Sequence, residues 1–151
     1  MAIISGGKWR GRVLPSKVSK GVRPTSARVR EAIFSMLGQD LQGLRFLDGY
    51  GGTGIMAIEA ASRGAEVVVV ERSSTAMRAI VENGASVGVT WLTKKADILS
   101  VASTLGQFDI VFLDPPYAQA VEPILEELGH RLNPDGVLLY EAAKQTKTPA
   151  E

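Results

Sequence analysis

A carboxylate, two prolines and a tyrosine follow one another at Asp114-Pro115-Pro116-Tyr117, directly after an apolar run that begins at Phe108. A proline has a fixed φ and no amide hydrogen, and an ionised aspartate only accepts hydrogen bonds. The segment therefore offers rigidly held acceptors beside an aromatic ring. We predict that Asp114 and the carbonyl group of Pro115 bind the exocyclic amine of a planar base, which stacks on Tyr117. The alternative is a proline-rich turn that ends a strand.

A second group of residues is a glycine-rich loop that follows an apolar run ending at Leu47. Gly49, Gly51 and Gly54 match the spacing G-x-G-x-x-G, which is typical of a loop that approaches a nucleotide cofactor closely. Glu71 follows 17 residues after Gly54, where a carboxylate can bind the hydroxyl groups of a ribose. The alternative is a tight glycine turn that binds no ligand.

The charge of Asp48, directly before these glycines, discriminates between two cofactors. A dinucleotide places its pyrophosphate at the N-terminus of the helix that follows such a loop, where Asp48 would repel it. S-adenosylmethionine has no phosphate, and its ammonium group would be attracted by a carboxylate. We therefore predict S-adenosylmethionine as the cofactor and S-adenosylhomocysteine as the product. A nicotinamide-dependent oxidoreductase is an alternative from a different class of enzyme.

Asp97 and Ile98, after the third predicted strand, are candidates for the adenine end of the cofactor. Asp97 would accept from the adenine amino group and Ile98 would cover the ring, although Asp97 is equally suited to be a simple helix N-cap. The complete set of predicted cofactor-binding residues is Asp48, Tyr50, Gly52, Thr53, Gly54, Glu71, Asp97 and Ile98.

The two groups together predict methyl transfer to an amine. The nitrogen of an exocyclic amine is a weak nucleophile because its lone pair is delocalised into the ring. Acceptors around it favour tetrahedral geometry, and alignment with the sulfonium methyl group supplies much of the rate. Asp114 would act as general base. The predicted catalytic residues are Asp114, Pro115, Pro116 and Tyr117, and no metal is predicted.

Alternating strands and helices are predicted to position these residues. The expected strands are 44–48, 67–71, 89–93, 108–114 and 136–141, and the expected helices are 25–37, 54–63, 74–83, 98–105 and 121–132. The first helix would be capped by Thr25 and would end at Gly38, with Val29, Ile33, Met36 and Leu37 on one side. This alternation predicts an α/β fold with a mostly parallel, twisted sheet and helices on both faces.

The composition narrows the class of protein. The chain has 151 residues, the size of one domain, and contains no cysteine and one histidine, which excludes a disulfide and argues against a zinc site. No apolar run reaches the roughly 20 residues that span a bilayer, and no signal peptide is evident. We expect a cytoplasmic monomer that does not bind membranes.

The charges are distributed unevenly along the chain. Residues 1–30 contain eight Lys and Arg and no acidic residue, whereas the remainder contains nine basic and 16 acidic residues. We predict a basic N-terminal hairpin, the arm (residues 1–24), on one globular unit (residues 25–151). The arm would bind a polyanionic partner through Lys8, Arg10, Arg12 and Arg23, with Trp9 stacking on a base. The alternative is a solvated hairpin without a partner.

Taken together, these residues resemble the RsmD family, bacterial methyltransferases of small-subunit (16S) ribosomal RNA within the larger group that carries an Asp/Asn-Pro-Pro-aromatic motif. The resemblance covers nearly the whole chain. It is carried by Gly6-Gly7-Lys8-Trp9-Arg10-Gly11, Arg23-Pro24-Thr25, Val29-Arg30-Glu31 with Phe34, Phe46-Leu47-Asp48, Gly52-Thr53-Gly54, Glu59-Ala60, Ser62-Arg63-Gly64-Ala65, Glu71 and Asp114 to Tyr117.

The resemblance implies a Rossmann-like class I fold and methylation of the N2 amine of a guanine in ribosomal RNA or an assembling small subunit. The chain departs from the family pattern in two places. Gly49, Tyr50 and Gly51 stand where the family usually has an aliphatic residue, an aromatic residue and alanine. The closing antiparallel hairpin that family members have after the fifth strand is expected to be missing. A methyltransferase acting on DNA or on another amine is the alternative on this fold.

Overall fold

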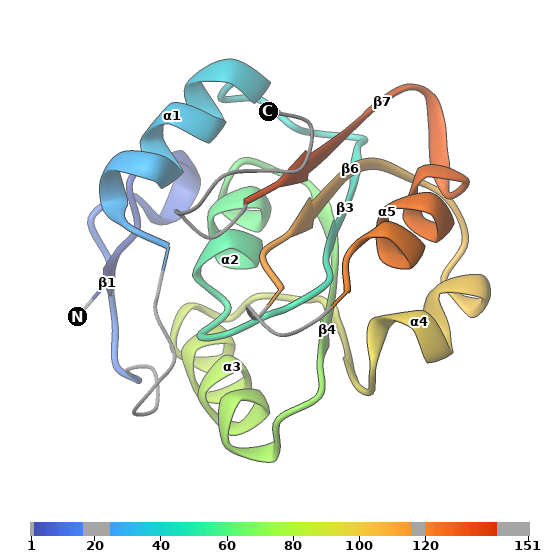
Figure 1. Ribbon diagram of the computed structural model, residues 1–151. Helices are drawn as coiled ribbons and strands as arrows, with labels where there is room; N and C mark the ends of the chain where they lie inside the picture. The colour runs from blue at the N-terminus through green and yellow to red at the C-terminus, as the bar shows by residue number, and fades with distance from the viewer. Residues whose placement is uncertain (1, 17–24, 116–119, 142–151) are drawn as a thin grey trace.

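Five parallel strands form the centre of the molecule, in the order β5-β4-β3-β6-β7. The structure, a computed structural model, describes residues 2–16, 25–115 and 120–141 (Figure 1). The strands are β3 (Arg45–Asp48), β4 (Glu66–Glu71), β5 (Leu92–Lys95), β6 (Phe108–Leu113) and β7 (Leu132–Tyr140). All neighbouring pairs are parallel, which confirms the predicted sheet.

Helices cover both faces of this sheet (Figure 1). They are α1 (Ala27–Leu37), α2 (Ile55–Ser62), α3 (Ser74–Val87), α4 (Ile98–Val101), which continues into the 3-10 helix η2 (Ala102–Thr104), and α5 (Glu122–Gly129). One core cluster joins the sheet to α1, α2 and α3, and a second joins it to α4 and α5. Successive strand residues, such as Phe46 and Leu47, contribute to opposite clusters. No helix among the described residues is long and apolar enough to cross a membrane.

Helix α1 differs from its prediction at its start and on its inward face. The N-cap is Ser26, whose Oγ accepts from the Val29 amide, and not Thr25, which is buried. Gly38 ends the helix as expected, with a φ of 106°. Met36 is 64% exposed, so the predicted apolar side is not buried along its whole length, and the buried residues are Phe34 and Arg30. The periodicity alone did not separate these faces, because the inward face includes a charged residue.

Four further boundaries shift by several residues. Helix α3 continues to Val87 and is ended by Gly88, and β5 therefore starts at Leu92 and not at residue 89. Val89 and Trp91, which were assigned to the strand, instead pack against the core from the connection. On the other side, α5 ends at Gly129 and β7 already begins at Leu132, with an irregularity in its pairing to β6.

The arm forms the predicted antiparallel hairpin, made of β1 (Ala2–Ile3) and β2 (Val13–Leu14). The connection between them contains a 3-10 helix, η1 (Gly7–Trp9). A Cβ atom at Gly7 would lie 2.2 Å from the Ser62 carbonyl oxygen, so the hairpin touches α2 with no space for a side chain. Ile4 and Leu14 are buried in one cluster with two residues of α2. The boundary at residue 24 stays a prediction.

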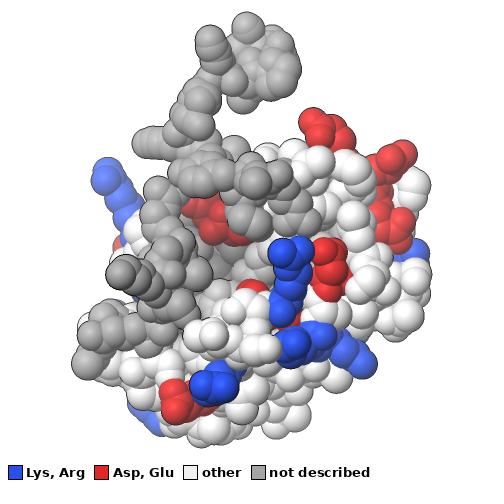
Figure 2. All heavy atoms as spheres, turned by 60° about the horizontal axis from the view of Figure 1, so that its bottom comes forward, with Lys and Arg blue, Asp and Glu red and all other residues white. Residues whose placement is uncertain are grey.

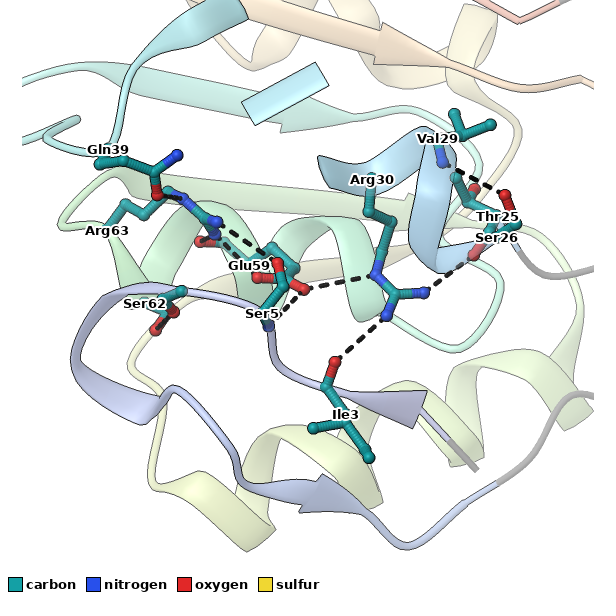
Figure 3. A network of polar contacts seen from close by, with 11 residues as sticks. Ile3, Ser5, Thr25, Ser26, Val29, Arg30, Gln39, Glu59, Ser62 and Arg63 are labelled. Carbon is teal, nitrogen blue, oxygen red and sulfur yellow. Dashed lines mark hydrogen bonds and ion pairs between the residues drawn. The ribbon is translucent and has the colours of Figure 1, made fainter. Parts of the chain in front are cut away.

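The carboxylate of Glu59 anchors this hairpin (Figure 3). It is fully buried on α2 and accepts from Arg63 Nη1 at 2.7 Å, from Arg30 Nε at 3.3 Å and from the Ser5 amide at 2.9 Å. Arg30 also donates to the carbonyl oxygens of Ile3 and Thr25, at 3.1 and 2.9 Å. The side chain that was counted among the basic charges of the N-terminal region is thus buried and paired.

We expect Glu59→Ala to lower the free energy of unfolding by about 3–5 kcal/mol, because it leaves two buried guanidinium groups without their carboxylate. Urea denaturation followed by circular dichroism measures this change. The matched control is Glu66→Gln, which removes an exposed partner of Arg45 and should cost no more than about 1 kcal/mol. Equal effects of the two substitutions would contradict the role given to Glu59.

Candidate active site

The strand order reverses next to β3. The chain passes from β3 outward to β4 and β5, and then returns to place β6 on the opposite side of β3. In open α/β sheets, ligands bind at such a reversal, beyond the carboxyl ends of the strands. Asp48 is the last residue of β3 and pairs with Phe112, two residues before Asp114. The two predicted acidic residues, Asp48 and Asp114, therefore lie at the same edge of the sheet.

Three carboxylates come together at this edge of the sheet. Asp48 is 1% exposed, and burial raises its pKa well above the usual 3.8. The amide of Tyr50 donates to Asp48 at 3.2 Å and opposes this shift, whereas the negative charges of Glu71 and Asp114 add to it. The edge is therefore an acidic environment that favours a positively charged ligand.

Backbone amides of the glycine-rich loop bond to two strands of the sheet. The amide of Gly49 donates to Phe112 of β6, and the amide of Gly51 donates to Val70 of β4, both at 3.0 Å. The Glu71 carboxylate accepts from the Gly52 amide at 3.0 Å and, through its second oxygen, from the Ser73 amide at 2.9 Å. The loop and the carboxylate that was predicted for the ribose are thus held in direct contact.

Close packing explains the glycines that depart from the family pattern. A Cβ atom at Gly49 would lie 2.6 Å from the side chain of Leu113, and one at Gly51 would lie 2.6 Å from Ile80. In contrast, Gly52 has a φ of 60° and no atom within 4 Å of the position that a Cβ would take. The backbone is therefore open to a ligand at Gly52 and closely packed at Gly49 and Gly51.

Tyr50 has a buried hydroxyl group without a hydrogen-bond partner among the described residues. Burial and the nearby charge of Asp97 raise the pKa of this phenol to about 12, against the opposing effect of Arg72. A buried hydroxyl that lacks a partner is costly, and a ligand with a polar group at this point would satisfy it. The hydroxyl is neutral at physiological pH and able to donate.

Asp97 has a clear structural role. Its Oδ1 accepts from the Leu99 amide at 3.0 Å, which confirms the alternative of a helix N-cap, and its Oδ2 lies 3.5 Å from Arg72 Nη1. Ile98 is 1% exposed and belongs to the core cluster on the α4 side. The contacts of Asp97 and Ile98 with an adenine ring stay predictions.

The basic residues of the arm are exposed where the structure describes them. Lys8 and Arg10 reach solvent, and Arg12 donates to the Ser86 carbonyl oxygen at 2.7 Å. Trp9 packs partly against the core, with Lys8 Nζ 4.8 Å from its ring centroid. Arg23, Pro116 and Tyr117 lie outside the described residues, and the roles predicted for them are not tested.

Figure 2 turns the lower side of Figure 1 toward the reader and shows charges of both signs. The described acidic and basic side chains form small separate groups on this face and not one continuous basic patch. Binding of a polyanion would therefore depend on particular basic side chains, such as those of the arm, and not on a uniformly positive face.

The sequence analysis missed two residues that contact the loop region. Arg72 lies next to Tyr50 and Asp97, and Asn83 donates to the Thr53 carbonyl oxygen at 2.8 Å. Asn83 follows Ile80 by three residues and Ala76 by seven, all on the buried face of α3. A polar residue at a helix position of apolar spacing was the available signal, and ending the predicted helix at residue 83 obscured it.

Comparisons with known proteins agree with this architecture. The family model described as "Conserved hypothetical protein 95" matches residues 1–151. Ribosomal RNA small subunit methyltransferase D of Escherichia coli K12 is 32% identical over 151 aligned residues, which cover 98% of this chain and 75% of that protein.

Two solved structures share the fold. A hypothetical protein of Thermus thermophilus is 30% identical, with a TM-score of 0.84, and the match covers 99% of this chain and 90% of that one. The 16S rRNA N2 G1207 methyltransferase RsmC of the same species, solved with AdoMet and guanosine, is 23% identical, with a TM-score of 0.69, and the match covers 82% of this chain and 36% of that one. These likenesses confirm the predicted Rossmann-like methyltransferase fold.

The raised pKa of Asp48 makes a prediction for stability against pH. Between the usual pKa of 3.8 and the raised one, the folded state holds a proton that the unfolded state has lost, so this residue's contribution to stability falls as pH rises. Asp48→Asn removes this pH-dependent loss of stability, because asparagine does not ionise, and it keeps an acceptor for the Tyr50 amide. We expect the variant to be more stable than wild type near pH 7, by about 1.4 kcal/mol per unit of raised pKa, and the difference to vanish near pH 4.

Urea denaturation at intervals from pH 4 to pH 8 measures this difference. Glu126→Gln, which neutralises an exposed carboxylate, is the control and should not show it. A stability difference between Asp48→Asn and wild type that does not change with pH would show that Asp48 is ionised throughout.

Proposed function

Because the chain belongs to the family described as "Conserved hypothetical protein 95", the RsmD family, we propose that it is an S-adenosylmethionine-dependent methyltransferase of 16S ribosomal RNA and that it acts on the N2 amine of a guanine. The observation that carries the proposal is the meeting of Asp48, Glu71 and Asp114 beside the glycine-rich loop at the strand-order reversal. The N2 position of the target extends the proposal beyond what the family relationship supports by itself.

The charge of the site favours this cofactor. The negative charges of Glu71 and Asp114 already contribute to the raised pKa of Asp48, and a pyrophosphate would add negative charge to the same edge. A cofactor with an ammonium and a sulfonium group relieves this repulsion. The proposal therefore prefers S-adenosylmethionine to a nicotinamide dinucleotide.

Each residue of the loop region has a proposed contact. Asp48 attracts the ammonium group, the open backbone at Gly52 receives the amino-acid end, and Glu71 accepts from the ribose hydroxyl groups. The buried hydroxyl of Tyr50 gains a polar partner from the ligand. Thr53 and Gly54 complete the loop, and Asp97 and Ile98 face the adenine. These contacts fit the donors and acceptors present in the structure.

The residues after β6 prepare the amine for attack. Asp114 and the Pro115 carbonyl group accept hydrogen bonds from the amine, while Pro116 and Tyr117 hold the plane of the base. When bound, the cofactor would supply a sulfonium methyl group for transfer to the amine nitrogen, with S-adenosylhomocysteine as the product. Asp114 receives the proton that the nitrogen loses.

The arm is proposed to bind the RNA. Lys8 and Arg10 are exposed and suited to phosphate contacts, and Arg12 and Arg23 extend this set. Trp9, which is partly buried, would stack on a base. The substrate is ribosomal RNA, free or in an assembling small subunit, and the protein would act on it as a monomer in the cytoplasm.

Transfer of tritiated methyl groups tests the proposal. The purified protein is incubated with labelled S-adenosylmethionine and small ribosomal subunits from cells that lack this enzyme, and the RNA is digested to nucleosides. We expect the label in N2-methylguanosine. Label in another nucleoside would overturn the assigned amine, label in added DNA but not in RNA would favour the DNA methyltransferase, and no label with measurable cofactor binding would indicate a different substrate.

Substitutions at Asp114 separate its two proposed tasks. Asp114→Ala removes both the acceptor and the base, and we expect kcat to fall by about 10²–10⁴-fold, with a change of less than about threefold in the Kd for S-adenosylhomocysteine. Asp114→Asn keeps an acceptor oxygen and should retain more activity. Glu122→Gln, an exposed carboxylate on α5, is the control. Unchanged turnover in Asp114→Ala would remove this residue from the mechanism.

Charge reversal tests the arm. In Lys8→Glu/Arg10→Glu we expect the KM for small subunits to rise at least about tenfold and its salt dependence to become weaker, because phosphate contacts are lost. The Kd for S-adenosylhomocysteine, measured by calorimetry, should stay within about twofold of wild type. Arg78→Glu, an exposed charge reversal on α3, should change neither the KM for small subunits nor the Kd for S-adenosylhomocysteine. Weaker cofactor binding together with unaffected RNA binding would refute the assignment of the arm to RNA.

A further inference from the structure

The side-chain amide of Asn83 joins the arm to the glycine-rich loop. Asn83 is fully buried on α3. Its Oδ1 accepts from the Ser16 amide at 2.8 Å, and its Nδ2 donates to the Ser16 carbonyl oxygen at 3.2 Å and to the Thr53 carbonyl oxygen at 2.8 Å. Both polar atoms of one side chain are therefore used, and they connect segments that are far apart in the sequence.

On the arm side, Asn83 holds the end of the hairpin. The amide and the carbonyl group of Ser16 both bond to the same side chain, as a strand residue bonds to its neighbour, and this fixes the backbone in position and direction. The Ser16 hydroxyl group donates to Glu82, and Arg12 donates to the Ser86 carbonyl oxygen. The described arm thus ends against α3 beside Asn83.

On the loop side, Asn83 holds the peptide that leads into α2. Thr53 stands between Gly52 and Gly54, whose φ values of 60° and 85° are both in the left-handed region. Its carbonyl group is held by Asn83, while the Gly52 amide is held by Glu71. Two flexible glycines are thereby kept in one conformation on either side of a fixed residue.

Asparagine has a low helix propensity, and its amide is costly to bury unless it is bonded. At this position the amide is fully bonded, and its bonds reach outside its own helix. The contacts of Asn83 therefore serve the relation between the arm and the loop more than the stability of α3.

We propose that Asn83 is a positioning residue that sets the arm, and the RNA bound to it, at a fixed distance from the cofactor loop. The proposal rests on the proposed function, since it assigns RNA to the arm and S-adenosylmethionine to the loop. Breaking only the arm half of the connection should weaken use of the RNA, whereas breaking both halves should also weaken cofactor binding.

Three variants separate these effects. Ser16→Pro removes the amide that donates to Asn83 and the hydroxyl group that donates to Glu82, and it leaves the bond to Thr53. Asn83→Ala removes both connections, and Arg78→Gln, an exposed residue on the same helix, is the control. Calorimetry gives the Kd for S-adenosylhomocysteine. Methyl transfer to small subunits from cells lacking this enzyme gives kcat and KM, and hydrogen exchange reports on residues 2–16 and 49–54.

In Ser16→Pro we expect the KM for small subunits to rise about tenfold, with a Kd for S-adenosylhomocysteine within about twofold of wild type. In Asn83→Ala both should rise about tenfold, and amide exchange should quicken in both segments. Arg78→Gln should match wild type in every measurement. An unchanged KM in Ser16→Pro, or an unchanged Kd in a folded Asn83→Ala, would overturn the proposal.

If Asn83→Ala does not fold, Ser16→Pro decides the matter alone. If wild type methylates no RNA, the proposed function fails, and hydrogen exchange then tests the connection by itself. Faster exchange in both segments of Asn83→Ala, but not of Arg78→Gln, supports the connection, and faster exchange in only one segment refutes it.

Discussion

The buried carboxylate of Glu59 is the interaction on which the arrangement of the molecule depends. Both of its oxygens receive charge-assisted hydrogen bonds, from Arg30 and Arg63. Removing three charged groups from water is costly, and that cost is offset only when the remaining donors also find acceptors. Arg30 meets this condition by donating to the Ile3 and Thr25 carbonyl groups, so the arm, α1 and α2 must close on one point (Figure 3).

Because Glu59 belongs to α2, the same helix supports the arm and begins at the glycine-rich loop. All eight residues of α2 are buried, between the sheet on one side and the hairpin on the other. A helix packed in this way has little freedom to shift, since protein interiors are close to crystal density. The basic side chains of the hairpin and the open backbone at Gly52 are thereby set in a constant relation, with Asn83 as a second connection at the far end of the hairpin.

The sequence was sufficient to predict the meeting of Asp48, Glu71 and Asp114, because all three end parallel strands and such ends share one edge of a sheet. It was insufficient for the buried ion pairs. Helical periodicity assigns charged residues to the solvent side, and Arg30 was therefore counted as a surface charge. Its partner is 29 residues away, and only tertiary packing brings the two together. The choice of Ser26 over Thr25 as the N-cap has a similar origin, since the Thr25 carbonyl group is bonded to Arg30 and both side chains suit a cap.

The acidic edge of the sheet lowers the stability of the protein without a ligand. Asp48 is buried beside two other carboxylates, and its raised pKa measures the free energy that this placement costs. Real proteins break a rule of stability mainly where a ligand compensates for it. A cation at this edge would lower the pKa of Asp48. Because it would bind only to the folded state, it would also raise the free energy of unfolding, by an amount that grows with its affinity. The electrostatic repulsion that lowers the stability of the ligand-free protein thus also makes the site selective, because it disfavours anionic ligands and favours a cationic one.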